Sequence, residues 1–486
     1  MIFVSNAAPI VVIILTILDY TLRALAVIFI PVNRKPQTTT AWLIAIFAVP
    51  SLGWVAFFLF GSNKLPRIRR KRQLEINQFI LDTTEGIDRV SELEPAWLEP
   101  IVQLNRRLGA MPMVGGNTAK LYSDYNESLK AMTDAVDSAV RNVHVEFYIL
   151  ALDRTTAPFF DAMAAAVKRG VTVRVLLDHI ACLRAPHYFS TLRRLRAIGV
   201  QWHLMLPIQP WRGRAQRIDL RNHRKLLVID GAVAFTGSQN MVDRTYNKRA
   251  NKRRGLAWRD LMVRFEGPIV AGINALFITD WYSETNELLL REAETVDRKS
   301  APDLLDCQVV PSGPGFEGEN NLRLFNSLLY SAQEKIIITS PYFVPDDSML
   351  YAITTAAQSG LDVQLFVSEV GDQPVVYHAQ RSYYTALLNA GVKIWLYESP
   401  TVLHAKHFTI DDQVAVIGSS NMDMRSFSLN LEISVMVRGA TFVNKLRELE
   451  ADYRSRSREL TLDEWREQPL RSKVLDNVAR ITATVQ

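Results

Sequence analysis

Residues 117–460 contain the same pattern twice, and this duplication constrains the fold more than any other feature of the chain. A β-rich run at 143–148 has a counterpart at 337–342, and each follows an amphipathic helix pattern. Each half then contains two successive units, and each unit consists of a helix, a glycine stop and a buried strand. The stop glycines are Gly170, Gly199, Gly360 and Gly391. A period this long indicates domain duplication and not a solenoid.

The correspondence extends to the end of both halves. Gly267 and Gly439 close matching apolar strands, and an Asp-aromatic pair comes thirteen residues after each. We therefore predict two copies of one α/β unit, at residues 117–290 and 305–486, the second including a C-terminal helix. Residues 291–304, which are rich in charge, are the predicted linker.

Each copy contains one set of reactive side chains with the spacing H-x-K-x4-D-x6-G-S-x-N. The first set is His223, Lys225, Asp230, Ser238 and Asn240, and the second is His404, Lys406, Asp411, Ser419 and Asn421. Because side chains alternate along a strand, His-x-Lys on a strand places both side chains on one face, and the returning strand brings Ser and Asn beside them. The glycine before each serine would let the backbone approach a phosphate closely. Each copy thus supplies half of a site.

Two pairs of carboxylates occupy matching positions in the copies. Asp230 and Asp411 end the motif strands, where they act either as turn residues or as electrostatic support for the site. Asp260 and Glu432 each lie seven residues before the closing glycine of their copy. A carboxylate there can hold a catalytic histidine in one tautomer, so we predict Asp260 and Glu432 as orienting carboxylates.

Two apolar runs, residues 9–30 and 41–60, precede the repeats. Each has about 20 residues, enough to cross a hydrocarbon core of about 30 Å. A cleaved signal peptide would be followed by a polar chain, whereas a second apolar run follows here. We therefore predict a membrane hairpin in residues 1–62, which either spans or re-enters, and a basic juxtamembrane linker over 63–116.

Charge predicts the orientation of this hairpin and the chemistry of the partners. Six cations between residues 64 and 72 outweigh the two in the short loop between the apolar runs. The positive-inside rule then predicts a multi-pass membrane protein with a cytoplasmic catalytic domain, and a hairpin returns the N-terminus to that side. The net charge of +6 favours anionic partners such as membrane lipids, nucleic acid or phosphorylated substrates. Two cysteines exclude a disulfide framework.

The two motifs resemble those of the phospholipase D superfamily, whose members carry two such HKD motifs, and the resemblance covers about residues 117–460. The hairpin, the basic stretch and the segments 340–347 and 418–427 are similar, more narrowly, to the bacterial cardiolipin synthases of that superfamily. The resemblance implies a protein of the bacterial inner membrane with two α/β repeats, each a mixed sheet flanked by helices, packed about a pseudo-twofold axis with the site at their interface.

The residue types fit attack on a phosphodiester, which resists nucleophiles because it is anionic. The two motif lysines can neutralise that charge. Phosphate binding is predicted for Ser238, Asn240, Ser419 and Asn421. One imidazole attacks phosphorus and forms a phosphohistidine, while the other protonates the leaving alcohol. The resemblance implies His223 as nucleophile and His404 as acid and base, and the pseudo-symmetry leaves the reverse assignment open. We expect no cofactor, and no carboxylate cluster in the sequence would hold a metal.

Four functions fit these features. The favoured one transfers a phosphatidyl group between two phosphatidylglycerol molecules, giving cardiolipin and glycerol. The alternatives are hydrolysis or another headgroup exchange, a phosphodiesterase nuclease, and a lipid-binding scaffold. The membrane hairpin argues against nucleic acid as a partner, and two intact motifs argue against a scaffold. The oligomeric state is left open.

Two basic segments allow more than one interpretation. The run at 247–254 is either a solvated loop or an attractor of anionic headgroups. Near the C-terminus an apolar stripe recurs at helical spacing among cations: Leu470, Val474, Leu475, Val478 and Ile481. The stripe either lies on the membrane or packs on the second repeat, and core packing is the commoner use of such a pattern.

Overall fold

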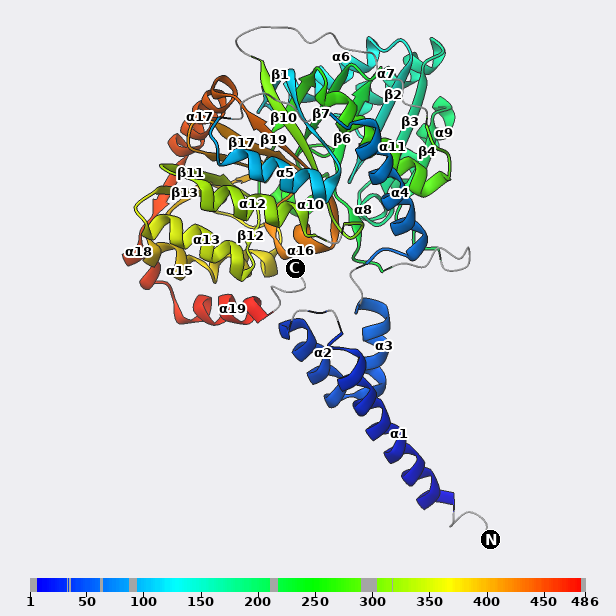
Figure 1. Ribbon diagram of the computed structural model, residues 1–486, viewed down its shortest axis with the longest axis vertical. Helices are drawn as coiled ribbons and strands as arrows, with labels where there is room; N and C mark the ends of the chain where they lie inside the picture. The colour runs from blue at the N-terminus through cyan, green and yellow to red at the C-terminus, as the bar shows by residue number, and fades with distance from the viewer. Residues whose placement is uncertain are drawn as a thin grey trace. The chain divides into compact units, whose positions relative to one another are not determined.

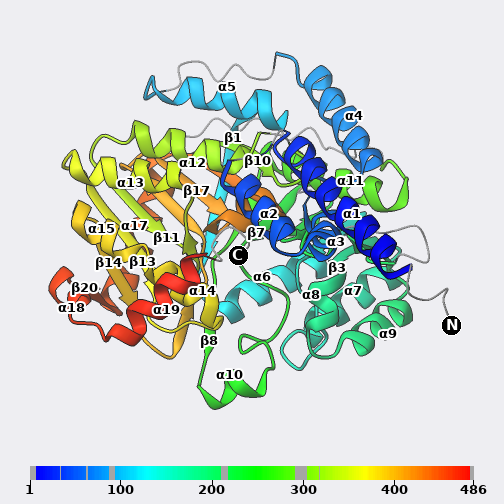
Figure 2. The same ribbon diagram turned by 90° about the horizontal axis from the view of Figure 1, so that it is seen from below.

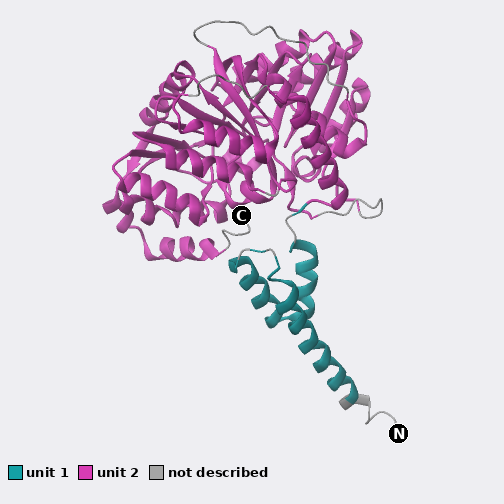
Figure 3. Ribbon diagram, viewed as in Figure 1, with its two compact units in different colours: residues 1–64 teal, residues 65–486 magenta. Residues whose placement is uncertain are grey.

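The computed structural model describes residues 7–32, 34, 36–61, 64–86, 94–209, 217–289, 304–316 and 318–481. It divides into two compact units, Met1–Lys64 and Leu65–Gln486 (Figures 1 and 3). Most of the predicted linker at 291–304 lies outside the described residues.

The first unit contains the helices α1 (Ala7–Phe29), α2 (Pro36–Ala48) and α3 (Pro50–Phe60). Within α1, Ile10–Phe29 is long and apolar enough to cross a membrane, by length and composition, and it is the one helix of the described residues that is. The single helix expected over 41–60 is instead two helices. Val49 leaves the helical conformation (φ −141°, ψ 87°) because Pro50 lacks an N–H group and disfavours helical backbone before it.

Helices α2 and α3 fold back on each other. A Cβ atom on Gly53 would lie 2.7 Å from the Cα of Ile46, so only glycine permits this approach. The guanidinium of Arg34 donates to the Gly61 carbonyl at 3.2 Å and lies 4.6 Å from the ring centroid of Phe57. The start of α2 therefore lies beside the end of α3.

The second unit begins with two helices, α4 (Arg67–Thr83) and α5 (Leu98–Gly109), in the segment predicted as a basic linker. Helix α4 packs against α11 (Ile269–Thr285), where Arg69 donates two hydrogen bonds to Glu284 at 2.8 and 2.7 Å. In α5, Asn105 donates to Gln308 at 3.0 Å. Much of the predicted linker is thus a structured part of the second unit.

One 16-stranded mixed sheet runs through the second unit. The first repeat contributes strands in the order β4 (Gln201–Met205), β3 (Thr172–Asp178), β2 (Asn142–Phe147), β6 (Lys225–Ile229), β7 (Val233–Gly237), β9 (Met262–Glu266) and β1 (Met113–Tyr122). The second contributes β14 (Lys393–Tyr397), β13 (Asp362–Ser368), β11 (Lys335–Thr339), β16 (His407–Ile410), β17 (Val414–Gly418), β19 (Asn430–Arg438) and β10 (Leu305–Ser312), with β20 (Ser457–Leu460) added at the edge. The identical order confirms the duplication.

The repeats join where β1 pairs antiparallel with β10. In each repeat the three outermost shared strands are parallel and the rest are antiparallel, which makes the sheet mixed. The helices of the outer layers are α6 (Tyr125–Asp137), α7 (Ala157–Lys168), α9 (Tyr188–Ile198), α12 (Asn320–Ser331), α13 (Asp347–Gln358) and α15 (Tyr384–Ala390). The four stop glycines end α7, α9, α13 and α15 with φ between 84° and 96°, a conformation that favours glycine.

The strands pack apolar side chains on both faces. In β6, Leu227 and Ile229 face the core under α6, α7 and α9. Leu226 and Val228 face the opposite core, which the two repeats share beneath α11 and α17 (Ala440–Ser455). The continuous apolar runs after the motif lysines thus follow from burial on two faces.

Candidate active site

Each motif histidine is positioned by a short strand that pairs with the other repeat. Strand β5 (Arg221–Asn222) pairs with β19, and the His223 amide donates to the Leu431 carbonyl at 2.8 Å. Strand β15 (Thr401–Leu403) pairs with β8 (Ala257–Arg259), and the His404 amide donates to the Arg259 carbonyl at 2.7 Å. His-x-Lys therefore does not lie on one regular strand as expected, because β6 begins only at Lys225 and β16 only at His407.

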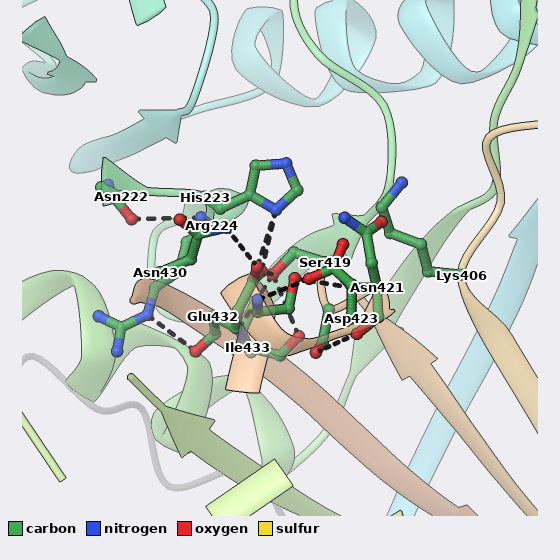
Figure 4. Close-up of polar contacts among 12 residues, drawn as sticks. Asn222, His223, Arg224, Lys406, Ser419, Asn421, Asp423, Asn430, Glu432 and Ile433 are labelled. Carbon is green, nitrogen blue, oxygen red and sulfur yellow. Dashed lines mark hydrogen bonds and ion pairs between the residues drawn. The ribbon is translucent and has the colours of Figure 1, made fainter. Parts of the chain in front are cut away.

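The predicted orienting carboxylates bind the histidines across the repeat interface. The His223 Nδ1 atom lies 2.9 Å from Oε1 and 3.1 Å from Oε2 of Glu432 (Figure 4). The His404 Nδ1 atom lies 2.6 Å from Oδ1 of Asp260. Each repeat thus provides one histidine and the carboxylate for the histidine of the other repeat.

The motif serines contact these carboxylates, which differs from their predicted role on phosphate. Ser238 donates to Asp260 Oδ1 at 2.7 Å and accepts from the Leu261 amide at 2.9 Å. Ser419 donates to Glu432 Oε2 and accepts from the Ile433 amide at 3.0 Å. Each hydroxyl therefore fixes the orientation of a carboxylate.

The glycines before these serines are explained by strand packing. A Cβ atom on Gly237 would collide with the Leu261 carbonyl oxygen, and one on Gly418 would collide with the Ile433 carbonyl oxygen. The predicted close approach to phosphate is thus replaced by a close approach to the strand segment that follows each carboxylate.

The two motif lysines are buried beside the histidines. Lys225 Nζ donates to the His223 carbonyl at 2.6 Å, and Lys406 Nζ donates to the His404 carbonyl at 2.8 Å. Burial lowers the pKa of Lys406 to about 8, against the opposing pull of Asp260 and Glu432. Burial also lowers the pKa of Lys225 well below its usual value. These poorly solvated cations are suited to hold a phosphate anion.

The histidines are neutral at pH 7 and their carboxylates are charged. Burial lowers the pKa of both His223 and His404 to about 4, although the carboxylates pull the other way. Burial works against ionisation of Asp260 and Glu432, yet the neighbouring imidazoles and lysines hold the pKa of each carboxyl below its usual value. The neutral ring donates its Nδ1 proton to the carboxylate, which leaves a lone pair on Nε2 for a phosphorus atom.

The motif asparagines lie at the same site. Asn240 accepts the Ile149 amide at 3.2 Å and donates to the Tyr246 hydroxyl at 2.8 Å. Asn421 interacts with the buried carboxyl of Asp423. In Figure 4 the His223 ring, the Lys406 ammonium group and the Asn421 amide lie on the same side of the Glu432–Ser419 pair. Lys225 and Lys406 each interact electrostatically with both His223 and His404, so the histidines and lysines of the two repeats lie close together.

The motif aspartates lie away from this cluster. Asp230 accepts the amides of Val140, Arg141 and Asn142 at 2.7–2.9 Å, and Asp411 accepts those of Gln333, Glu334 and Lys335. Five residues of strand at about 3.3 Å each separate the lysine from the aspartate, roughly 16 Å. Of the two interpretations of Asp230 and Asp411, the structure therefore favours turn residues, not catalytic ones.

Two tyrosines beside the histidines were not predicted as site residues. The ring centroid of Tyr148 lies 4.7 Å from that of His223, and that of Tyr342 lies 6.4 Å from that of His404. Their signal in the sequence was their matched position at the ends of the runs 143–148 and 337–342. Tyr342 also donates to Asp372 at 2.9 Å.

The other histidines are packed or paired elsewhere. His144 stacks on Phe277 with ring centroids 4.3 Å apart, and His203 contacts the edge of Trp281.

Both cysteines are buried and reduced. Among the described residues, no group of three or more His, Cys, Asp and Glu side chains has the arrangement of a metal site.

The rate of the reaction catalysed at this site should have an alkaline limb near pH 8. Lys406 is charged below its pKa of about 8 and loses its proton above it, so kcat/KM should fall beyond that point, and Lys225, whose pKa burial also lowers, should add to the steepness of the fall. Lys406→Arg, which stays protonated, should move the limb to higher pH even if the rate is reduced. A limb unchanged in Lys406→Arg would assign it to another group.

Comparison with known proteins places the two repeats and the N-terminal unit in described families. The family "Cardiolipin synthase, PLD-like domain" matches residues 132–259 and 325–452, and "Phospholipase_D-nuclease N-terminal" matches residues 21–62. The chain is 34% identical over 477 residues to cardiolipin synthase A of Proteus mirabilis, covering 96% of each chain. It is 32% identical to cardiolipin synthase A of Yersinia pseudotuberculosis, covering 92% of each.

A solved structure shares the fold. Phosphatidylserine synthase of Haemophilus influenzae superposes with a TM-score of 0.59 at 14% identity, covering 79% of this chain and 97% of that one. At this identity the likeness concerns the arrangement of the two repeats.

Proposed function

The chain belongs to the cardiolipin synthase family of phospholipase D-like proteins, and from that premise we propose that it transfers a phosphatidyl group from one phosphatidylglycerol to another, giving cardiolipin and glycerol. The observation that carries the proposal is the reciprocal pair of histidine–carboxylate contacts, His223–Glu432 and His404–Asp260. Such a pair provides both a nucleophile and a proton carrier for one phosphorus atom. The reaction exchanges one phosphodiester for another, so it requires no nucleotide.

In the first step the Nε2 atom of His223 attacks phosphorus of the first phosphatidylglycerol. The bond from phosphorus to the glycerol oxygen breaks, and that oxygen takes a proton from Nε2 of His404. The bound phosphodiester anion raises the pKa of His404, which enables it to hold this proton before transfer. Glycerol leaves, and the phosphatidyl group stays on His223.

In the second step a hydroxyl of the second phosphatidylglycerol loses its proton to His404 and attacks phosphorus. The bond between phosphorus and His223 breaks, cardiolipin is released, and both histidines return to their starting protonation states. Throughout, Lys225 and Lys406 offset the negative charge on the non-bridging oxygens. We expect the amides of Asn240 and Asn421 to donate to the same oxygens.

The direct test is incubation of the full-length protein with labelled phosphatidylglycerol as the sole lipid. Cardiolipin and free glycerol in equal amounts are the expected products. Phosphatidic acid as the main product would make the protein a hydrolase, and cleavage of DNA without any lipid product would make it a nuclease. Either result would overturn the proposed transfer.

We propose further that α1 crosses the membrane once and that α2 and α3 re-enter it. At about 1.5 Å per residue, α2 and α3 are each shorter than a hydrocarbon core of about 30 Å. The hydrogen bond from Arg34 to Gly61 supports placing both ends of this segment on one side. Arg34 and the six cations between residues 64 and 72 then share the cytoplasmic side with the catalytic unit. The N-terminus then lies outside, whereas the hairpin expected from the sequence returns it to the cytoplasmic side.

Single cysteines distinguish these topologies. In spheroplasts, a membrane-impermeant maleimide should label Ser5→Cys, which precedes α1, and should leave Val32→Cys unlabelled until the membrane is permeabilised. Val32 is 59% exposed and both native cysteines are buried, so access depends on the side of the membrane. A hairpin that crosses twice would give the reverse labelling.

A further inference from the structure

The C-terminal helix α19 (Leu470–Ile481) has its polar and apolar faces reversed relative to a helix on a water-facing surface. Its buried residues are Asp476 and Ala479, at 3% and 7% exposure. The apolar stripe points outward, with Leu470, Val474, Val478 and Ile481 exposed by 76%, 52%, 56% and 79%. Packing of this stripe on the second repeat, the commoner use of such a pattern, is therefore excluded.

The polar contacts of Asp476 fix this orientation. Its carboxylate accepts from Nδ1 of His378 at 2.7 Å and from Nε of Arg381 at 3.3 Å. Both partners belong to α14 (Pro374–Arg381), on which α19 packs (Figure 2). At the far end of α19, the Arg480 guanidinium lies 5.0 Å from the ring centroid of Tyr383. Burial of the Asp476 carboxylate without these partners would cost much free energy. The contacts therefore hold Asp476 on the inner face of α19 and the apolar stripe on the outer face.

Helix α14 connects this face to the catalytic residues. It begins directly after Asp372 and Gln373, which hydrogen-bond the Tyr342 hydroxyl at 2.9 and 3.0 Å. The Tyr342 ring lies beside His404, and Gln380 of α14 accepts the Phe343 amide at 3.0 Å. Val375 of α14 is itself 53% exposed and apolar. The outward apolar surface thus lies next to the Tyr342 side of the active site.

We propose that α19 is an interfacial helix that docks the catalytic unit on a bilayer surface containing anionic lipids. The exposed stripe supplies apolar area to the acyl-chain boundary, and Arg471 and Arg480, both exposed on the same helix, supply positive charge for headgroup phosphates. Docking on this face brings the Tyr342 side of the active site, next to His404, to the membrane surface from which lipid headgroups enter. A bilayer suits a surface that pairs an apolar stripe with cations, and the membrane crossing proposed for α1, which is long and apolar enough for it, would tether the chain to the same membrane.

A fluorescent label tests the docking without relying on activity, and therefore independently of the proposed function. Val474→Cys in the full-length chain, labelled with an environment-sensitive dye, is reconstituted in phosphatidylglycerol-containing liposomes. Its emission should shift to the blue and be quenched by spin-labelled acyl chains, while aqueous iodide should quench it weakly. The native cysteines, Cys182 and Cys307, are 1% and 0% exposed and do not compete for the dye.

Val140→Cys is the matched control. Val140 is a 77% exposed valine at the end of the first repeat's strands opposite to the histidines, so its label should be quenched by iodide and not by lipid. Equal iodide quenching at both positions would overturn the proposal. A blue shift of the Val474→Cys label in detergent that depends on protein concentration would assign the face to a second copy of the chain, which would also overturn it.

Activity provides a second readout, which rests on the proposed lipid substrate. Val474→Asp with Val478→Asp should lower the rate on liposomes by about tenfold, since two side chains lose their apolar burial and two anions approach a negative surface. The rate in detergent micelles and the melting temperature should not change. Val474→Leu with Val478→Leu should keep the wild-type rate on liposomes. If the melting temperature of the Asp variant fell in parallel with its activity, the face would pack within the protein and not on lipid.

Discussion

A His404→Ala variant is expected to accumulate a phosphohistidine on His223 when it is given a phosphodiester with a good leaving group. Such a leaving group departs without a proton, so the first step proceeds while the second, which needs His404 as base, is blocked. Turnover of phosphatidylglycerol should fall by about 10⁴-fold, the upper range for loss of general acid–base catalysis. His223→Ala should lose turnover as severely and form no covalent species.

The measurement is retention of label from the phosphoryl group on denatured protein, stable to alkali and labile to acid. His187→Asn, at an exposed histidine outside the site, is the control and should behave as wild type. Label retained in His223→Ala and absent from His404→Ala would reverse the two roles, which pseudo-symmetry permits. Near-normal turnover in either variant would refute a shared site.

The duplicated architecture was predictable because its signals are local. Helix patterns, stop glycines and apolar strands repeat in the same order, and each stop glycine has the positive φ that a helix end of this kind favours. The order of the strands within each repeat then follows from one copy to the other. The break at Pro50 was also visible in the sequence, but proline is tolerated in membrane helices, so the pattern alone did not decide between a kink and a fold-back.

Which carboxylate contacts which histidine was not predictable, because these contacts depend on pairing between distant segments. The carboxylates were identified by their matched positions, yet nothing local indicates that Glu432 serves His223 and Asp260 serves His404. That exchange follows from β5 pairing with β19, over 200 residues away, and from β15 pairing with β8. The motif spacing also grouped Asp230 and Asp411 with the site, although strand geometry carries them to the opposite end.

Because each carboxylate contacts the histidine of the other repeat, a substitution in one repeat should disable the histidine of the other. Glu432→Gln is expected to abolish the step that depends on His223, although Glu432 belongs to the repeat that contains His404. The glutamine can present its amide N–H to Nδ1 of His223, which forces the ring proton onto Nε2 and removes the attacking lone pair. Phosphohistidine formation from the activated donor should fall by about 10²–10⁴-fold.

Asp260→Asn should have the complementary effect. It disturbs His404, so the activated donor should still label His223, while transfer to the second lipid should be lost. Glu450→Gln is a matched control, because Glu450 is a fully buried carboxylate that contacts Thr409 and Arg447 outside the site. Any loss it shows measures general destabilisation, which melting temperatures quantify. If Glu432→Gln spared labelling of His223 and Asp260→Asn prevented it, each carboxylate would serve the histidine of its own repeat, and the interface would position the histidines without tuning them.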